Sequence, residues 1–312
     1  MKWRDIPKID AHIQIIPDEV HAANPDSEDE FSFAKVSSYQ KIMDQFNIRK
    51  AIIMPFNDPW LMSMDFTVDA AHQNLVKICE EDGRFSCFAD VDIRNTPANT
   101  CEHIYKILAH PEFCGIKLHP NNSGMNIDDR YNDIIADLAV NTDYPIAVHS
   151  YPSSSREQDR SDYCAPKRIE HWLDRHPGLK VIVCHLGGFQ WEDAVDLDVH
   201  FDISAILPDF VERYGIKETN MILRRFGVNR LLFGTDWPCS RSVEPTHIID
   251  RYLDILDQMD FTEEEMHRIG HLNAEFFLGL KFDKFSFARK LLNLAVCGDN
   301  HVAENNEIQR SR

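Results

Sequence analysis

The feature that most constrains the fold is a regular alternation of short apolar runs with segments of helical periodicity. Eight runs have the length and the apolar, β-branched composition of buried strands. These runs cover residues 8–15, 50–54, 85–91, 115–119, 145–149, 180–185, 200–204 and 230–235. Helices are predicted at residues 35–46, 65–81, 97–109, 128–141, 166–175, 208–226 and 243–259, and a last one from Thr262, where Thr-Glu-Glu-Glu supplies an N-cap and an acidic first turn.

Strands that alternate with helices imply parallel βαβ units, because parallel neighbours need crossover connections. A doubly wound open sheet would satisfy the same alternation, but its usual glycine-rich turn is absent after the first run. The count of eight and the polar residues at several strand ends favour a (β/α)₈ TIM barrel. We therefore expect a single-domain α/β barrel over residues 1–280 and a C-terminal tail over 281–312, with one amphipathic helix at 285–296.

Charge and cysteine usage limit the partners and the compartment. With 51 acidic and 33 basic residues the formal charge is -18, which argues against nucleic acid or an anionic membrane as partner. No apolar stretch approaches the length of about 18 residues that a membrane span needs, and the eight cysteines form no CxxC pair. We expect a cytoplasmic protein that acts on a small molecule. A homo-oligomer, with the 285–296 helix between subunits, stays open.

The segment IDAHIQI at residues 9–15 places three polar side chains on one face of the first strand. Side chains alternate along a strand, so Asp10, His12 and Gln14 share a face and the residues between them share the other. A polar face on this strand must point into the barrel or to water at its rim. His12 is therefore a candidate for binding a metal or a substrate, and a solvated histidine at a strand end is the alternative.

Two further apolar runs each end at a histidine. PIAVHS ends the fifth strand at His149, and VIVCHLGG ends the sixth at His185. A single histidine of this kind is usually a hydrogen-bonded rim residue, but two in succession point to a site. Gly187 and Gly188 after His185 would let the backbone approach a ligand closely, or they form an ordinary turn.

Asp236 follows the last strand in LLFGTDWP, and strand eight of a barrel neighbours strand one. Asp236 is therefore expected to face His12. Together His12, His149 and Asp236 supply two imidazoles and one carboxylate, the ligand set of a catalytic divalent-metal centre. A metal would lower the pKa of bound water and polarise a substrate carbonyl. Asp236 would then accept the proton of that water, and His185 would polarise or protonate the reacting group.

Three basic side chains are candidates for substrate binding. GIKLHP places Lys117 and His119 on one face of the fourth strand, pointing into the barrel mouth. Arg156, in the polar loop after the fifth strand, would bind an acid at the mouth. The alternatives are a structural pair between Lys117 and an interior acid, and a solvated loop around Arg156.

The ordered set IDAHIQI, GIKLHP, PIAVHS, CHLGG, FDISA, LLFGTDWP and LNAEFFLG resembles the amidohydrolase superfamily. It is most similar to the branch that contains aminocarboxymuconate semialdehyde decarboxylase and related hydrolases and hydratases. The resemblance implies a single metal held by two histidines of an HxH pair, a fifth-strand histidine and an eighth-strand aspartate. By position these are His12, Gln14, His149 and Asp236, with His185 as catalyst, and the substrate is a small carboxylated or aromatic-like molecule.

Gln14 departs from the family pattern, because it stands where the second histidine of the pair belongs. A carboxamide oxygen is a harder and weaker donor than an imidazole, so zinc affinity should fall and manganese becomes a candidate. We expect one divalent ion, zinc first and manganese second. Some relatives hydrolyse lactones without metal, so a metal-free site is a further outcome.

These observations rank the functions. First is a metal-dependent hydrolase that attacks a small carboxylated or carbonyl compound with metal-activated water. The alternatives are a decarboxylase (carboxy-lyase) of an unsaturated or aromatic acid and a metal-independent lactone hydrolase. A non-catalytic binding protein ranks last, because a decayed site should have lost more than one ligand.

Overall fold

Eight parallel strands form one sheet in the order of the chain, β1 to β8. The computed structural model describes residues 1–23, 33–55, 67–151, 162–239 and 244–280. The strands are β1 (Lys8–Ile13), β2 (Ile48–Ile53), β3 (Phe85–Ala89), β4 (Phe113–Leu118), β5 (Ile146–Val148), β6 (Val181–Val183), β7 (His200–Asp202) and β8 (Leu231–Leu232). Each strand pairs with the next, as a barrel requires.

The sheet curves back so that the segment after β8 meets β1. Ile13 and Trp237 form a parallel bridge, and the backbone N–H of Ala11 donates to the carbonyl of Phe233 at 2.9 Å. The backbone N–H of Asp236 donates to the carbonyl of His12 at 2.8 Å. These bonds close the barrel and confirm the predicted (β/α)₈ TIM-barrel fold. They also place the end of β8 directly beside the end of β1.

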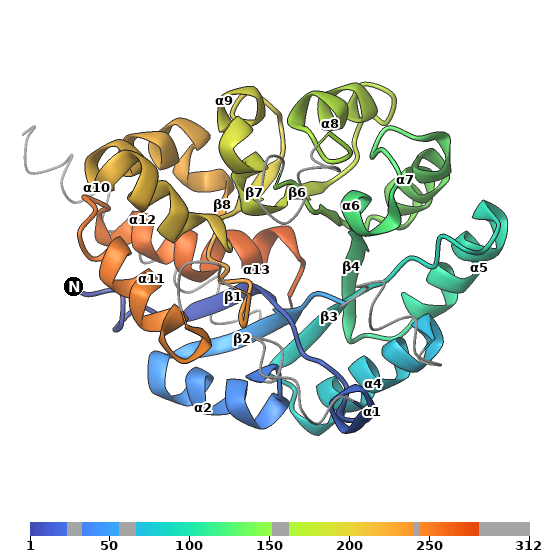
Figure 1. Ribbon diagram of the computed structural model, residues 1–312, viewed down its shortest axis with the longest axis horizontal. Coiled ribbons are helices and arrows are strands. Elements are labelled where there is room, and N and C mark those ends of the chain that lie inside the picture. The colour runs from blue at the N-terminus through green and yellow to red at the C-terminus, as the bar shows by residue number, and fades with distance from the viewer. Residues whose placement is uncertain (24–32, 56–66, 152–161, 240–243, 281–312) are drawn as a thin grey trace, which may run out of the picture. The chain divides into compact units, whose positions relative to one another are not determined.

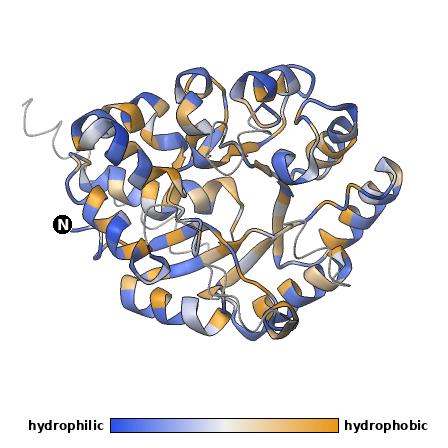
Figure 2. Cartoon of the chain, viewed as in Figure 1, coloured by the Kyte–Doolittle hydropathy of each residue, from blue (hydrophilic) through white to orange (hydrophobic). Residues whose placement is uncertain are grey.

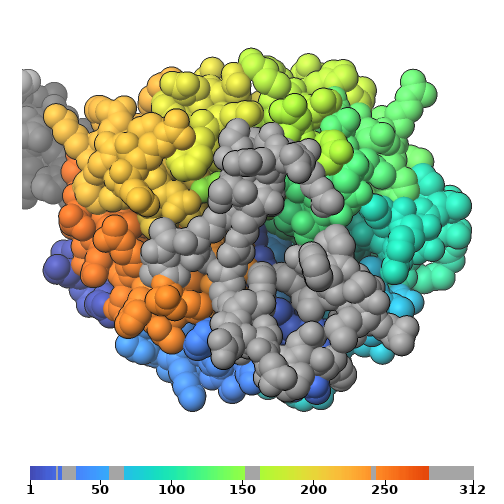
Figure 3. Space-filling model, in the orientation of Figure 1, coloured from blue at the N-terminus to red at the C-terminus, as the bar shows by residue number. Residues whose placement is uncertain are grey.

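Helices follow the strands and surround them (Figure 1). They are α1 (Asp18–Ala23), α2 (Val36–Phe46), α4 (Val68–Glu81), α5 (Pro97–Ile107), α6 (Pro120–Ser123), α7 (Arg130–Thr142), α8 (Pro166–Leu173), α9 (Trp191–Ala194), α10 (Ile206–Phe226), α11 (Ile248–Leu256), α12 (Glu263–His267) and α13 (Asn273–Phe277). Hydrophilic and hydrophobic residues alternate along them (Figure 2), as expected for helices with one face on a core. In Figure 3 the residues of α8, α9 and α10 form the upper edge of the view.

The predicted helix from Thr262 is present with the cap that its sequence implies. The Thr262 side chain accepts the backbone N–H of Glu265, and the Glu265 carboxylate accepts the backbone N–H of Thr262. Elsewhere the boundaries differ. The helix predicted at 208–226 begins at Ile206 and is interrupted at Gly215, whose φ of 78° lies outside the helical range.

The strands are shorter than predicted at their carboxyl ends, and the difference matters for the site. β6 ends at Val183, and Cys184–Gln190 forms a tight 3₁₀ turn with left-handed residues. β5 ends at Val148 and β8 at Leu232, so the polar residues that follow lie in loops above the barrel. Loop backbone can turn a side chain in ways that strand alternation does not allow.

Residues 1–278 form one compact unit and residues 279–312 a second. The helix predicted at 285–296 lies outside the described residues. Within the described part of the chain the seven cysteines are free thiols. No helix described there is long and apolar enough to cross a membrane.

Candidate active site

Four polar side chains from four strand ends lie together at the mouth of the barrel. His12 belongs to β1, His149 follows β5, His185 lies in the turn after β6, and Asp236 follows β8. All four are at least 92% buried, with exposed fractions of 1%, 8%, 2% and 8% in that order. The carboxyl end of the strands is where barrel enzymes carry their chemistry.

The His12 imidazole lies between two carboxylates. Its Nδ1 is 2.9 Å from Oδ2 of Asp202, and its Nε2 is 3.1 Å from Oδ1 of Asp236. Burial and the Lys117 ammonium disfavour the imidazolium, but Asp236 and Asp202 outweigh them and hold the pKa of His12 well above its usual value. Because a carboxylate lies at each nitrogen of this ring, Nε2 favours binding a cation, either a proton or a metal ion.

The two carboxylates stay ionised for the same reason. Burial opposes ionisation of Asp236, yet His12 overcomes it and lowers the pKa of Asp236 to about 2. Burial likewise opposes ionisation of Asp202, and His12 again lowers the pKa of that carboxyl, well below its usual range. The mouth therefore holds two negative charges that a divalent cation would neutralise.

Asp202 and Ser204 are parts of the site that the sequence patterns did not predict. Oδ1 of Asp202 accepts the backbone N–H of His185 at 2.8 Å and that of Ser204 at 3.1 Å, and it also accepts the Ser204 hydroxyl. Both side chains are fully buried. Their signal was present in FDISA, where residues 202 and 204 share one strand face in the same way as residues 12 and 14.

His185 is fixed by the same segment. Its Nδ1 is 2.9 Å from the carbonyl oxygen of Ser204, and its Nε2 is 3.1 Å from Nδ1 of His149. Burial, as the largest cause, lowers the pKa of His185. The backbone is left-handed at His185, with a φ of 60°, and at Asp236, also 60°. Non-glycine residues avoid this region, and such strain gathers at functional sites.

Gly187 has a packing role in this turn. Its φ is 75°, and a Cβ there would fall 2.7 Å from Cβ of Ala194 and 3.0 Å from Cγ of Pro166. The close backbone approach predicted for a ligand is therefore an approach to α8 and α9. The glycine lets the turn pack closely against these two helices, which positions His185.

Gln14 contacts the predicted metal ligand Asp236. Its Nε2 donates to Oδ1 of Asp236 at 3.0 Å, and its Oε1 accepts the Cys239 thiol at 3.6 Å. In this orientation the amide nitrogen, which cannot bind a metal, faces the carboxylate. Rotation of the amide would exchange the two atoms, so Gln14 becomes a ligand only in the flipped form.

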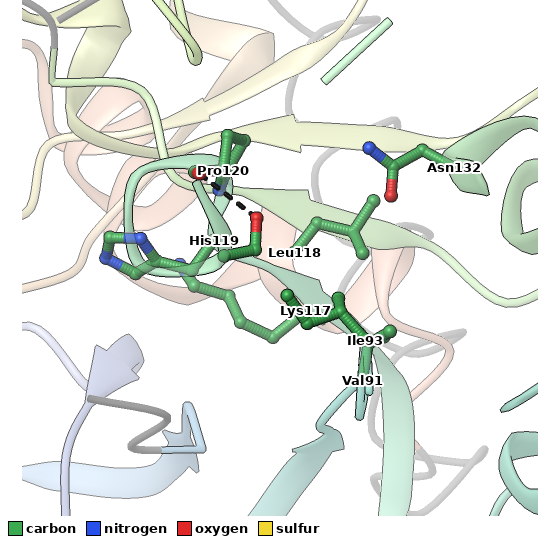
Figure 4. A pocket seen from close by; sticks show the side chains of 8 residues that line it. Val91, Ile93, Lys117, Leu118, His119, Pro120 and Asn132 are labelled. Carbon is green, nitrogen blue, oxygen red and sulfur yellow. Dashed lines mark hydrogen bonds between the residues drawn. The ribbon is translucent and has the colours of Figure 1, made fainter. Parts of the chain in front are cut away.

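Two of the predicted substrate-binding residues, Lys117 of β4 and His119 just after it, lie in different surroundings. Lys117 is 97% buried, and its Nζ donates to Sγ of Cys184 at 3.3 Å. The His119 ring stacks on His149 with centroids 3.9 Å apart. Lys117 and His119 also line a small pocket at the end of β4, and Asn132 of α7 lies on its far side in Figure 4. Arg156 lies outside the described residues.

At the mouth, His12, His185 and Asp236 have ligand atoms close enough together to hold a metal ion, and so do His12, Cys184 and Asp202. One atom each from His12, His185 and Asp236 lies within 4.8 Å of the others. His149 lies next to this group through its contact with His185. Two imidazoles and a carboxylate are a donor set that zinc or manganese accepts, so the residues suit a divalent ion.

Comparison with solved structures shows the same fold. A 5-carboxyvanillate decarboxylase from Novosphingobium aromaticivorans, in complex with manganese and a nitrobenzoic acid, has a TM-score of 0.66 at 15% identity and covers 89% of this chain and 97% of its own. A 2,6-dihydroxybenzoate decarboxylase from Rhizobium has a TM-score of 0.65 at 16% identity, covering 88% and 99%. A probable 2-pyrone-4,6-dicarboxylic acid hydrolase from Acinetobacter baumannii, with citric acid bound, has a TM-score of 0.63 at 14% identity, covering 88% and 100%.

Sequence comparison gives the family. No curated protein matches the chain. A sequence model of the amidohydrolase family matches residues 9–280, which begin within β1, run past the end of α13 and include every site residue described above. This chain belongs to the amidohydrolase family.

Proposed function

We propose that the chain is a metal-dependent decarboxylase of a small aromatic or unsaturated acid. The observation that carries this proposal is the buried Lys117 ammonium beside the donor set of His12, His185 and Asp236. The charge of Lys117 acts on all three of these residues. A cation and a metal site in one closed mouth would attract and orient an acid. Two of the three similar structures are decarboxylases of aromatic acids.

The residues that would hold the metal are His12, His185 and Asp236, with His149 alongside. We propose manganese ahead of zinc, because Gln14 replaces a softer imidazole and a similar structure contains manganese. When bound, the ion would supply a Lewis acid that stabilises negative charge on the substrate. Its oxygen-tolerant coordination would also suit a hydroxyl or carboxylate of the acid.

The proton chemistry belongs to the chain itself. In decarboxylation the bond between the substrate carbon and its carboxyl carbon breaks, CO₂ leaves, and the electron pair that remains must take up a proton. His149 is the residue that would deliver that proton, because it is not one of the three proposed ligands and its Nδ1 lies beside them, 3.1 Å from Nε2 of His185.

Hydrolysis by metal-activated water, the first-ranked function from sequence, is the second candidate here. One similar structure is a probable hydrolase of a pyrone dicarboxylic acid, which supports this second candidate. In that reaction Asp236 would accept the proton of the attacking water. The two reactions need the same scaffold but release different products.

The test is a product assay on the manganese-loaded protein. A panel of hydroxy- and methoxybenzoic acids is followed by CO₂ release, and a panel of lactones and esters by acid release. We expect CO₂ from at least one aromatic acid and a loss of at least about 100-fold in kcat in His149→Asn. Acid release from the second panel with no CO₂ from the first would replace decarboxylation with hydrolysis.

A further inference from the structure

Asp202 and Ser204, at the end of β7, contact both imidazoles of the proposed metal site on the side away from the metal. We propose that this pair is a positioning device that sets which nitrogen of His12 and of His185 carries the proton. Each Nε2 is thereby left with a lone pair that a metal ion could accept. The inference rests on the proposed metal site, and its test separates the two.

The hydrogen bonds of His12 determine its tautomer. Both nitrogens of His12 face a carboxylate, and a neutral ring can donate to only one of them. Oδ1 of Asp236 already receives the Nε2–H of Gln14 at 3.0 Å, whereas Nδ1 meets two acceptors, Oδ2 of Asp202 at 2.9 Å and Oγ of Ser204 at 3.1 Å, so Nδ1 donates. A neutral ring with its proton on Nδ1 has its lone pair on Nε2, the nitrogen that faces Asp236 at 3.1 Å. Metal-binding histidines are oriented in this way by carboxylates on their other nitrogen.

The hydrogen bonds of His185 give the same result from a different acceptor. Its Nδ1 lies 2.9 Å from the carbonyl oxygen of Ser204, which can only accept. The proton of a neutral His185 therefore lies on Nδ1, and its Nε2 carries the lone pair.

The Ser204 hydroxyl joins the two rings. Its single proton is donated to Oδ1 of Asp202, so towards the rings the oxygen can only accept. Nδ1 of His12 lies 3.1 Å from this oxygen and Nδ1 of His185 lies 2.9 Å from it. Each ring therefore meets two acceptors at Nδ1, and a proton on Nε2 would leave those acceptors without a donor.

The pattern predicts the effect of a nearly isosteric change, Asp202→Asn. The Oδ1 position must accept two backbone N–H groups, from His185 and Ser204, so the amide oxygen will occupy it. The amide NH₂ then takes the place of Oδ2 and faces His12. His12 must accept that N–H at Nδ1 and carry its own proton on Nε2, where a metal would bind. The His12 ring would then donate from Nε2 to Asp236. Because both ring nitrogens keep a hydrogen-bond partner, we expect the variant to fold.

Asp10 provides a matched control, because it is a fully buried carboxylate that bonds to hydroxyls in place of an imidazole. Its Oδ2 accepts from Tyr39 and from Thr235, each at 2.6 Å, and its Oδ1 accepts the backbone N–H groups of Thr235 at 3.0 Å and of His12 at 3.2 Å, which an amide oxygen would still accept. In Asp10→Asn the amide NH₂ would face two hydroxyl oxygens, which rotate and accept. No tautomer has to change.

The experiment combines metal affinity with the tautomers of the rings. Manganese affinity is measured by competition with a fluorescent chelator. The tautomers are read in histidine-labelled, metal-free protein by ¹⁵N NMR, above the pH at which both rings become neutral, with His12→Asn as the assignment variant. We expect protons on Nδ1 of both rings in the native protein. In Asp202→Asn we expect the His12 proton on Nε2 and an affinity about 10- to 100-fold lower, while Asp10→Asn stays within about 3-fold of the native protein.

Each outcome decides one proposal. An Nε2 proton on either ring of the native protein overturns the positioning role, and this arm needs no variant to fold. Equal losses of affinity in Asp202→Asn and Asp10→Asn would also overturn it, because they would indicate a merely structural carboxylate. If the native protein binds no manganese or zinc while the tautomers are as predicted, the metal proposal fails and the positioning role stands.

Discussion

Among the described residues, two clusters made of histidine and aspartate alone have ligand atoms within 4.8 Å of one another, yet their chemistry differs. One is the barrel mouth, with His12, His185 and Asp236. The other lies between α4 and α5, with Asp69, His72 and His103. By distance alone both could hold a metal ion. The hydrogen bond on the far nitrogen of each ring separates them.

In the cluster between the helices, the far nitrogen of His72 is an acceptor. The backbone N–H of Asp90 donates to its Nε2 at 2.8 Å. A neutral His72 must therefore carry its proton on Nδ1, the atom that lies 3.1 Å from Nε2 of His103. In the mouth the far nitrogens donate, which frees the near ones. Proximity brings ligands together, and hydrogen bonding outside the site decides whether a lone pair is available.

The largest expected effect is on metal binding. We expect His12→Asn to abolish the binding of one equivalent of manganese, because the central ligand is lost. His72→Asn should leave that equivalent in place. Equilibrium dialysis followed by elemental analysis measures both. Loss of metal in the His72 variant alone would reverse the comparison between the two clusters.

A second effect concerns Lys117, the buried cation whose charge acts on His12, His185 and Asp236. Lys117→Met should lower kcat/KM for an aromatic acid by about 100-fold, since one charged contact to a carboxylate is lost in a closed site. Lys50→Met is the control, because Lys50 bonds to the carbonyl of Gly83 at the opposite end of the strands. Steady-state kinetics on both variants tests this role, and equal losses would argue for a structural effect.

The cluster between the helices should make the protein less stable at low pH. Burial, followed by the charge of His103, lowers the pKa of His72 to about 3. Folding therefore disfavours the protonated ring, and His72 contributes stability that is lost as the pH falls below about 6.5 towards 3. At pH 4.5 the loss should approach about 3 kcal/mol. Urea unfolding of native protein and His72→Gln at pH 7 and 4.5 measures it. A native and variant protein with the same pH dependence would contradict the assignment.

The smallest expected effect is on metal preference. Gln14→His would supply the missing imidazole of the family pattern and raise zinc affinity about 10-fold relative to manganese. Competition binding with both ions measures the ratio. An unchanged ratio would mean that residue 14 stays hydrogen-bonded to Asp236 and does not bind the ion.

Much of the mouth could be predicted from sequence, because its signals are local. An apolar run that ends at His149, and a polar face that contains His12, follow from strand alternation and the barrel rule. The partner of Lys117 could not be predicted, because Cys184 reaches it from the turn after β6, two strands along the sheet from β4. The left-handed turn at His185 was also out of reach, since β-strand periodicity stops at Val183.

Asp202 and Ser204 form an intermediate case. Their spacing placed both on one strand face, but nothing in the segment FDISA says which rings they touch. That contact requires β7 to lie between β6 and β8, so that residue 202 lies between His185 and His12. Sequence patterns therefore locate the candidate ligands, and the fold identifies the groups that form hydrogen bonds with them.

The most direct test of the central claim is anomalous diffraction from crystals soaked in manganese. The account predicts one strong anomalous peak in the barrel mouth, within bonding distance of His12 Nε2, His185 Nε2 and an oxygen of Asp236. A peak between Asp69, His72 and His103 with none in the mouth would contradict it, as would an empty mouth in crystals of protein that decarboxylates its substrate.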